Sequence, residues 1–349
     1  MNILIVGLGS MGKRRVRCLQ HLGFGAEQIH GFDLRKDRRA EVAQTYGIHV
    51  HEAFDSAFEA AQPGAMVISV PPDVHHIYMK KALDLDVPFF VEASVIDEDL
   101  EAIIEQAEAQ GIPAVPSATM LFHPAIKTVR RIIDEGVLGK LSHMSLHAGQ
   151  YLPDWHTYEA VEDFYVSQPE TGGAREIVPF ELTWVTTLFG FPKRVAGVVG
   201  KTIDIEGAEA IDDTYNFILD YEGFMVTGIV DVVSRAATRR VLINGERGQF
   251  IWDWVEEEVR VYDGDTDTWT AHPYDMAAAA DGYDAKIGET MYIEEVRAFL
   301  NAVTEGDAFP NSLEEDLKVL RLLYAIEDAS DTGQMVPYAG AQPVARAQA

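Results

Sequence analysis

A glycine-rich turn near the N-terminus constrains the fold of this chain more than any other feature of its sequence. Gly7, Gly9 and Gly12 follow the apolar run Ile3–Val6 and open a helical pattern of apolar residues. In that context the spacing Gly-x-Gly-x-x-Gly predicts a strand, a turn and a helix that bind a dinucleotide. The first two glycines allow a tight turn and close approach of the pyrophosphate, and the third lets the helix pack on the strand.

The residues after the second predicted strand indicate which dinucleotide binds. Asp33 ends that strand, where a carboxylate accepts hydrogen bonds from the adenosine ribose and repels a 2′-phosphate. NAD is therefore the predicted cofactor. Arg35 opens a basic stretch that includes Arg38 and Arg39 and could bind a 2′-phosphate, so NADP remains an alternative.

The first third of the chain alternates short apolar runs with helical patterns, which predicts a parallel sheet with crossover helices. The runs are Ile3–Val6, Ile29–Phe32, Met66–Val70, Phe89–Val91 and 114–115. We therefore expect a dinucleotide-binding Rossmann domain over residues 1–120.

After Pro124 the pattern changes to a helix followed by strand-like segments with intervening turns, which predicts a second, α+β domain over residues 121–311 with an open, mainly antiparallel sheet. The predicted strands are 141–148, 194–203, 214–220, 225–233, 240–243 and 249–252. A helix over 312–330, opened by Ser312 and Glu315 as a capping box, is expected to return to the first domain. Residues 338–349 are expected to form a flexible tail.

Composition limits the partners. The chain has 28 Lys and Arg against 56 Asp and Glu, a formal net charge of −28, which disfavours nucleic acid and anionic membranes. A single cysteine, Cys18, excludes an internal disulfide, and no apolar run is long enough to span a bilayer. We expect a cytoplasmic protein without a metal site, because the histidines lack the spacing of zinc ligands.

Four ordered motifs resemble the glucose-fructose oxidoreductase, inositol dehydrogenase and rhizopine-catabolism (Gfo/Idh/MocA) family. They are Gly7-Leu-Gly-Ser-Met-Gly-Lys-Arg-Arg15, Val70-Pro-Pro-Asp-Val-His75, Phe90-Val-Glu-Ala-Ser94 and Phe122-His-Pro124. The resemblance implies NAD(P) in the first domain and a sugar or cyclitol between the two domains. It also places a set of residues at the cofactor: Gly7, Gly9, Ser10, Met11, Gly12, Asp33, Arg35, Ser69, Val70, Pro71, Pro72, His75 and Glu92.

The chain departs from the family pattern at the positions that usually carry catalysis. The family has Glu-Lys-Pro where this chain has Glu92-Ala93-Ser94, so the usual lysine is absent. Ile177 and Phe180 stand at the positions that the resemblance assigns to an Asp and a His, and Leu121 replaces an Arg.

Other polar residues are candidates for the missing functions. Tyr151-Leu-Pro-Asp-Trp-His156 resembles a loop of relatives that act on nucleotide sugars, and His156 is suited to proton transfer. Glu176 is the second candidate for the proton-transfer group. The predicted substrate-binding residues are Tyr151, Trp155, Arg175, Glu181 and Arg235. Arg175, Glu176 and Glu181 either pair with one another or line the pocket. Arg235 either binds an anionic group of the substrate or has a sheet-surface or dimer-contact role.

These expectations favour an NAD-dependent oxidoreductase that transfers hydride between nicotinamide and a secondary alcohol of a sugar, nucleotide sugar or cyclitol. Two alternatives stay open: a redox-neutral epimerase or lyase with tightly bound NAD, and a non-catalytic protein that binds NAD or a sugar. The open sheet of the second domain predicts a homodimer or homotetramer.

Overall fold

The computed structural model describes residues 1–155, 160–276 and 288–340. The chain forms two compact units. Unit 1 comprises Met1–Thr119 and Thr290–Leu317, and unit 2 comprises Met120–Glu289 and Lys318–Ala349. The boundary near residue 120 agrees with the sequence analysis, but the expected end of the second domain at residue 311 is corrected, because residues 290–317 belong to unit 1. The physical reason is helix α8 (Thr290–Thr304), whose buried face packs on helix α1.

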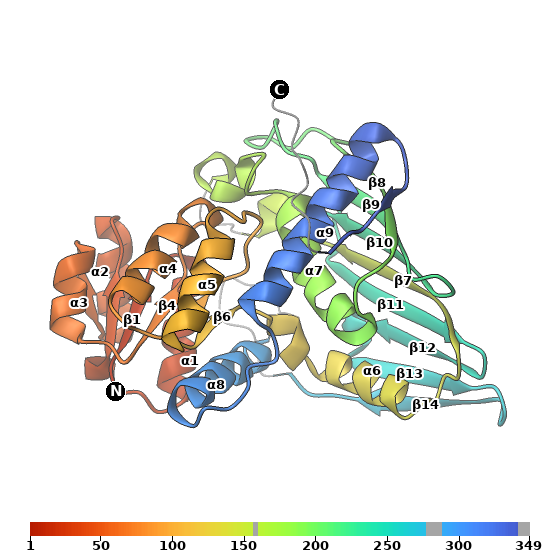
Figure 1. Cartoon of the computed structure of the whole chain (residues 1–349), viewed down its shortest axis with the longest axis horizontal. Helices are drawn as coiled ribbons and strands as arrows, with labels where there is room; N and C mark the ends of the chain where they lie inside the picture. The colour runs from red at the N-terminus through yellow and green to blue at the C-terminus, as the bar shows by residue number, and fades with distance from the viewer. Residues whose placement is uncertain (156–159, 277–287, 341–349) are drawn as a thin grey trace. The chain divides into compact units, whose positions relative to one another are not determined.

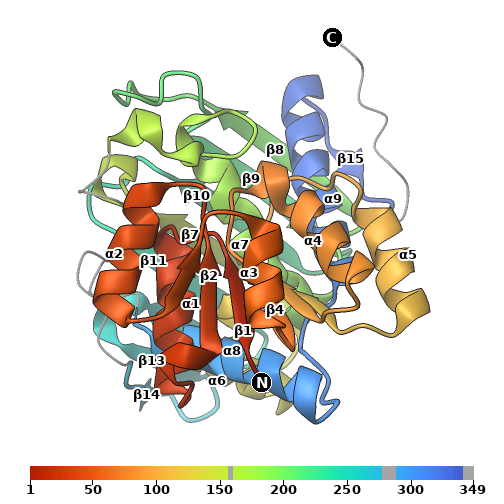
Figure 2. The ribbon, with the colours of Figure 1, turned by 90° about the vertical axis from the view of Figure 1, so that its left-hand side faces the viewer.

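Unit 1 contains a six-stranded parallel sheet in the order β3-β2-β1-β4-β5-β6. Its strands are β1 (Ile3–Val6), β2 (Ile29–Phe32), β3 (His49–His51), β4 (Ala65–Ile68), β5 (Phe89–Val91) and β6 (Ala114–Pro116). Its helices before residue 120 are α1 (Ser10–His21), α2 (Lys36–Tyr46), α3 (Phe54–Ala61), α4 (His75–Asp84) and α5 (Leu100–Gln110). Figure 2 shows α1 and α2 on one side of this sheet and α3, α4 and α5 on the other.

The covering of both faces explains the sequence pattern of the central strands. All four residues of β1, β2 and β4 are buried, and β1 and β4 appear as continuous apolar runs, whereas β2 also contains the buried His30. Strand β3 was not expected, because its sequence His49-Val-His51 lies at the sheet edge, is partly exposed and lacks an apolar run.

Unit 2 contains a nine-stranded mixed sheet in the order β14-β13-β12-β11-β7-β10-β9-β8-β15. The strands are β7 (Leu141–Gly149), β8 (Arg194–Gly200), β9 (Thr214–Asp220), β10 (Met225–Asp231), β11 (Thr238–Gly245), β12 (Gly248–Asp253), β13 (Glu258–Asp263), β14 (Thr268–Pro273) and β15 (Val336–Pro337). All neighbours pair antiparallel except β7 and β10, which are parallel. The predicted open and mainly antiparallel sheet is thus confirmed.

One face of the nine-stranded sheet is covered by helices. Figure 1 shows α6 (Pro124–Asp134) and α7 (Ala174–Phe189) on the same side of this sheet. Helix α9 (Leu313–Thr332) begins in unit 1 and continues into unit 2, where Ile326 packs against Gly197 of β8. The expected return of this helix to the first domain therefore holds only for its first turn, up to Leu317.

The other face of this sheet carries no helix from the described parts of unit 2. Strands β9 and β10 alternate buried and exposed residues, as expected when only one face is covered. Tyr338, the first residue of the expected tail, stacks on Phe191 and donates a hydrogen bond to the Lys318 carbonyl at 2.8 Å, so this residue is packed on unit 2. In the described ranges no helix is both long and apolar enough to cross a bilayer.

Candidate active site

The glycine turn of unit 1 has the backbone geometry that a dinucleotide requires. Gly7 has φ +94°, and a Cβ built there would lie 2.4 Å from the Ser69 carbonyl oxygen. A Cβ on Gly12 would lie 2.0 Å from the Gly7 carbonyl oxygen. Only glycine fits at these two positions, and helix α1 begins between them, at Ser10. The backbone N–H groups of the first turn of a helix form an anion-binding end, so the residues present fit the pyrophosphate of NAD.

Asp33 is held in place at the end of β2. Its Oδ2 accepts a hydrogen bond from the Leu8 backbone N–H and its Oδ1 from the Arg35 backbone N–H, both at 2.8 Å. This fixed carboxylate suits an adenosine ribose. The Arg35 side chain pairs with Asp37 at 2.6 Å, whereas the Arg38 guanidinium lies 3.9 Å from Asp33 and 3.3 Å from a Cβ built on Gly9. Arg38 therefore lies beside both Asp33 and the glycine turn.

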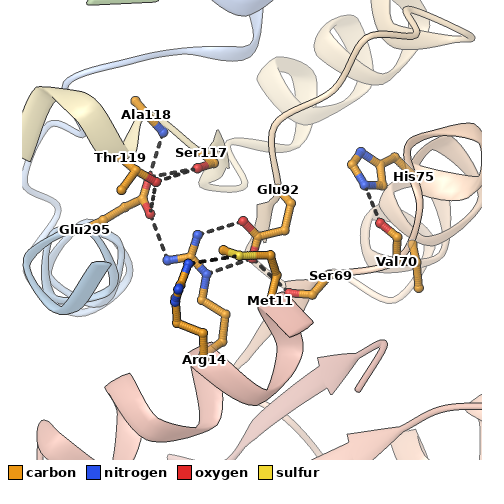
Figure 3. A network of polar contacts seen from close by, with 11 residues as sticks. Met11, Arg14, Ser69, Val70, His75, Glu92, Ser117, Ala118, Thr119 and Glu295 are labelled. Carbon is orange, nitrogen blue, oxygen red and sulfur yellow. Dashed lines mark hydrogen bonds and ion pairs between the residues drawn. The ribbon is translucent and has the colours of Figure 1, made fainter. Parts of the chain in front are cut away.

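The strand order of the sheet reverses between β1 and β4. Asp33 and the adenosine half of the cofactor belong on the β2 side of this point, and the nicotinamide half belongs on the β4 side. Ser69 follows β4, and Glu92 follows β5, so both lie at the carboxyl edge of the sheet. The Ser69 hydroxyl donates to Glu92 Oε1 at 2.9 Å, as Figure 3 shows. The next residues, Val70, Pro71 and Pro72, lead into helix α4.

His75 braces this turn from within the protein. Its Nε2 lies 2.8 Å from the Val70 carbonyl oxygen, and burial lowers the pKa of the imidazole to about 4. The ring is therefore neutral at physiological pH, and Nε2 carries the proton that it donates to Val70. Its Nδ1 is buried and has no partner among the described residues. His75 therefore stabilises the turn at Val70 through this hydrogen bond, and its contact with the cofactor stays a prediction.

Two residues of unit 1 that the sequence analysis missed contact this edge through Glu92. Arg15 of α1 forms a bidentate ion pair with Glu92, and it also pairs with Glu295 of α8. Arg15 and Glu295 lie 280 positions apart in the chain. No local pattern in the sequence could have joined them, because their contact depends on α8 returning to unit 1.

In unit 2, two of the charged residues of α7, Arg175 and Glu181, form ion pairs. Arg175 pairs with Glu327 at 2.6 Å and donates to the Glu170 carbonyl at 2.6 Å. Glu181 is fully buried; it pairs with Arg239 at 2.6 Å and accepts a hydrogen bond from the Trp184 indole. Both residues are thus in ion pairs with residues outside this segment, Glu327 and Arg239, and not with each other, so the expectation that the charges of this segment pair with one another is corrected.

Glu176 differs from these neighbours, because only one of its carboxyl oxygens has a partner within residues 1–155, 160–276 and 288–340. The Tyr165 hydroxyl donates a hydrogen bond to Oε1. Oε2 is buried and has no partner in the described parts of the chain. Burial raises the pKa of this carboxyl to about 7, although the bond from Tyr165 acts in the opposite direction. Such a group can take up or release a proton near neutral pH.

The predicted aromatic loop follows β7. Tyr151 precedes the short 3₁₀ turn Leu152–Asp154, and the Arg235 guanidinium lies 3.9 Å from the centre of the Tyr151 ring. The Trp155 indole Nε1 is buried without an acceptor among the described residues. His156, the first candidate for proton transfer, lies outside the described residues, so its role stays a prediction.

These unit 2 residues gather at one end of the sheet. Asp231 ends β10 and lies opposite Gly149 of β7 and Thr214 of β9 in the strand register. The turn that carries Arg235 is anchored there, because Asp231 accepts hydrogen bonds from the backbone of Val233 at 3.0 Å and Ser234 at 2.8 Å.

The start of α7 approaches the same end of the sheet. The Ala174 N–H donates to the Asp212 carbonyl at 3.4 Å, just before β9 begins. The Tyr151 loop, Glu176 and Arg235 therefore share one end of the unit 2 sheet.

Comparison with known proteins identifies the family. Residues 1–115 match the model described as "Oxidoreductase family, NAD-binding Rossmann fold", and residues 126–251 match the "GFO/IDH/MocA C-terminal domain". The chain belongs to the Gfo/Idh/MocA family. This protein is therefore an NAD(P)-dependent oxidoreductase that acts on CH–OH groups, as the glycine motif and the ordered motifs predicted.

Curated members of the Gfo/Idh/MocA family are distant from this chain. It is 22% identical over 305 residues to inositol 2-dehydrogenase 3 of Saccharopolyspora erythraea, an alignment that covers 80% of this chain and 88% of the relative. It is also 22% identical over 315 residues to D-xylose 1-dehydrogenase (NADP(+)) 2 of Haloferax volcanii, which covers 86% and 88%.

Solved structures share the fold. A levoglucosan dehydrogenase in complex with NADH has a TM-score of 0.82 and 16% identity, with 97% of this chain and 99% of that chain covered. An oxidoreductase from Agrobacterium radiobacter in complex with NAD+, L-tartaric acid and magnesium has a TM-score of 0.81 and 14% identity, with 97% and 98% covered. At these identities the likeness establishes the two-part Gfo/Idh/MocA fold.

Proposed function

We propose that this protein oxidises a secondary alcohol of a sugar, nucleotide sugar or cyclitol, and that Glu176 takes the hydroxyl proton. The observation that carries the proposal is the state of Glu176: one carboxyl oxygen accepts a hydrogen bond from Tyr165, and the other is buried and has no partner among the described residues. Leaving a buried polar atom unpaired costs about 1 to 3 kcal/mol, so such an atom calls for an explanation. A hydroxyl group of the substrate would supply the missing donor.

The chemistry requires a group of this kind. Nicotinamide, when bound, accepts the hydride from the alcohol carbon, and a base must remove the hydroxyl proton as charge develops on oxygen. Ala93 stands where the family usually has a lysine, and Phe180 stands at the position assigned to the usual histidine. Glu176, with a pKa raised to about 7 by burial, is the described residue that matches this requirement. His156 is retained as the other candidate for this role.

The substrate class rests on the relatives and on the aromatic loop. The relatives named above are dehydrogenases of inositol, xylose and levoglucosan. Tyr151 and Trp155 can pack on the C–H face of a sugar ring, and the unpaired Trp155 indole N–H can donate to a hydroxyl. Arg235 would add recognition of an anionic group, because its guanidinium has no acidic partner among the described residues.

The test compares the wild type with Glu176→Gln, which keeps an acceptor for Tyr165 but cannot take a proton. We expect turnover to fall at least ~100-fold with NADH affinity unchanged. The wild-type rate of alcohol oxidation should rise with pH through about 7, and this rise should disappear in the variant.

The companion variant His156→Ala distinguishes the two candidates. A loss of at least ~100-fold in His156→Ala together with near wild-type turnover in Glu176→Gln would assign the proton to His156. Substrate conversion without net formation of NADH would instead indicate a redox-neutral epimerase or lyase. Binding of NADH and sugar without any conversion would indicate a binding protein.

We also propose that the open face of the nine-stranded sheet pairs with a second copy of the chain. Val198, Ile218 and Met225 are exposed on neighbouring strands of this face, by 72%, 38% and 52%. A chain with a net charge of −28 repels its own copies, so a contact between copies requires a surface with few charges. Ile218 pairs with Thr227, which pairs with Ser145, and this row is uncharged. The expected assembly is a homodimer or homotetramer.

Sedimentation of the wild type and of Ile218→Glu tests this assembly. We expect the wild type to sediment as a dimer or tetramer, and the variant to dissociate because two buried charges would face each other. A wild type that stays monomeric at micromolar concentration, or an oligomer that the substitution leaves intact, would contradict the proposal.

We also propose a cytoplasmic location. The single buried thiol, Cys18, fits this location, because it needs no oxidising compartment.

A further inference from the structure

The carboxylate of Glu92 is held by an unusual buried network in unit 1. Arg15 Nε donates to Glu92 Oε1 and Arg15 Nη2 donates to Glu92 Oε2, both at 2.7 Å. The Ser69 hydroxyl adds a second donor on Oε1 at 2.9 Å. This pairing fixes both the position and the plane of the carboxylate, because a guanidinium fork fits a carboxylate in one orientation.

Glu295 holds the other side of Arg15. It is fully buried, and its Oε2 accepts hydrogen bonds from Arg15 Nη1 at 2.7 Å and from the Thr119 hydroxyl at 2.9 Å. Its Oε1 accepts from the Ser117 hydroxyl at 3.0 Å and the Ala118 N–H at 2.6 Å. Figure 3 shows Ser117, Ala118 and Thr119 around Glu295. Four donors meet the four acceptor sites of the two oxygens, so Glu295 can accept no further hydrogen bond.

Glu92 has one hydrogen-bond acceptor site without a donor among the described residues. Its Oε1 has two donors, whereas its Oε2 has only Arg15 Nη2 within the described parts of the chain. A carboxylate oxygen accepts two hydrogen bonds, so Oε2 can accept one more. Glu92 lies at the carboxyl edge of the sheet beyond the point where the strand order reverses, the edge at which the nicotinamide half of the cofactor belongs.

We propose that Arg15 and Glu295 are positioning residues for the nicotinamide end of the cofactor: they hold Glu92 so that Oε2 accepts one hydrogen bond from a hydroxyl or amide N–H of that half. Glu295 anchors Arg15 to the segment 117–119 that follows β6, and Arg15 transmits this anchor to Glu92. Helix α8 therefore belongs to the cofactor-binding machinery although it enters unit 1 only at residue 290.

The charges of the network favour a positioning role. The Arg14 guanidinium lies 4.0 Å from the centre of the Tyr292 ring, and that of Arg15 lies 4.5 Å from the centre of the Phe90 ring. Two arginines and two glutamates make this buried group neutral. Its effect on the cofactor is therefore geometric, and it should act alike on NAD+ and NADH.

The test is a fluorescence titration of NADH into Glu295→Gln and Arg15→Lys without any alcohol substrate. The amide of Glu295→Gln introduces an N–H₂ among four donors, and Arg15→Lys loses the fork. We expect each variant to weaken NADH binding about tenfold, with a similar loss for NAD+. The KM for NAD+ should rise by a similar factor, while kcat at saturating NAD+ changes less than about threefold.

Asp213→Asn is the matched control from unit 2. Asp213 is also buried and accepts four hydrogen bonds, from the N–H and hydroxyl of Thr202, the N–H of Ile203 and the hydroxyl of Thr214. It should lose thermal stability to a similar degree but keep its NADH affinity within about twofold, which separates positioning from general destabilisation.

Wild-type NADH affinity in Glu295→Gln would overturn the proposal. If that variant does not fold, Arg15→Lys decides, because it keeps the charge balance: unchanged affinity there would equally overturn it. Since no substrate is present, the result is independent of the role proposed for Glu176.

Discussion

Two buried carboxylates, one in each unit, illustrate how similar groups come to serve different ends. Glu295 of unit 1 has four donors on its two oxygens and a charged partner in Arg15. Glu176 of unit 2 has one donor, from Tyr165, and one buried oxygen without a partner. Glu295 has a donor at every acceptor site, so its carboxylate holds these neighbouring groups in place. The carboxyl of Glu176 has its pKa raised to about 7 and can exchange a proton.

The largest difference between the two should appear in stability. Arg15→Met leaves Glu92 and Glu295 as buried carboxylates without their common cation, and this should cost about 3 to 5 kcal/mol of unfolding free energy. Glu176→Gln removes a group that resists ionisation, so it should be at least as stable as the wild type at pH 8. Urea unfolding at that pH measures both.

A control separates loss of charge pairing from loss of side-chain packing. The double variant Arg15→Met/Glu295→Gln removes one cation and one anion together, and it should recover part of the loss seen in Arg15→Met. If Arg15→Met were as stable as Glu176→Gln, the contrast between a saturated and an unsaturated carboxylate would not hold.

The second contrast concerns the direction in which pH changes stability. The pKa of His75 in unit 1 is lowered to about 4 by burial, so below pH 6.5 the unfolded chain takes up a proton first and stability falls as pH falls. The pKa of Glu176 is raised to about 7, so between pH 4.5 and 7 the folded state holds the extra proton and stability falls as pH rises. Between pH 4.5 and 6.5 the two groups act in opposite directions.

Substitution of Glu176 should reveal the pH dependence of stability that His75 contributes. In Glu176→Gln, stability should fall more steeply on acidification from pH 6.5 to 5 than in the wild type, by up to about 1.4 kcal/mol per pH unit. Urea unfolding at several pH values measures the slopes. His123, with a pKa lowered to about 3 by burial, and Asp316, with a pKa raised to about 7, titrate like His75 and Glu176 but are present in both proteins. Equal slopes in the two proteins would show that Glu176 does not titrate in this range.

The sequence predicted the first unit better than the second because their sheets differ in burial. Central strands such as Ile3–Val6 are buried on both faces and stand out as apolar runs. Strands β13 (Glu258–Asp263) and β14 (Thr268–Pro273) were missed, because β14 is almost wholly exposed and β13 contains charged residues. An edge strand of an open sheet is stabilised by backbone pairing, which leaves little trace in the order of side chains.

The residues of the candidate site also differ in how far the sequence could predict them. Gly7, Gly12 and Asp33 act through local backbone geometry, so their spacing was sufficient to predict them. Glu176 was named as a candidate from its neighbours in sequence, but Tyr165, its partner, was not. The ion pair of Arg15 with Glu295 joins helices far apart in the chain, and only the folded structure could reveal it.

The smallest predicted effect tests the link between Tyr165 and Glu176. The hydrogen bond from the Tyr165 hydroxyl lowers the pKa of Glu176 against the larger effect of burial. Tyr165→Phe removes that bond, so the pKa should rise above about 7 and the midpoint of the pH–rate profile for alcohol oxidation should move up by roughly 0.5 to 1 pH unit. The plateau rate at high pH should change only a few-fold, because the carboxylate is still present. A downward shift, or a profile that does not move, would mean that the ionisation governing the rate belongs to another group, and His156 would then be the first to examine.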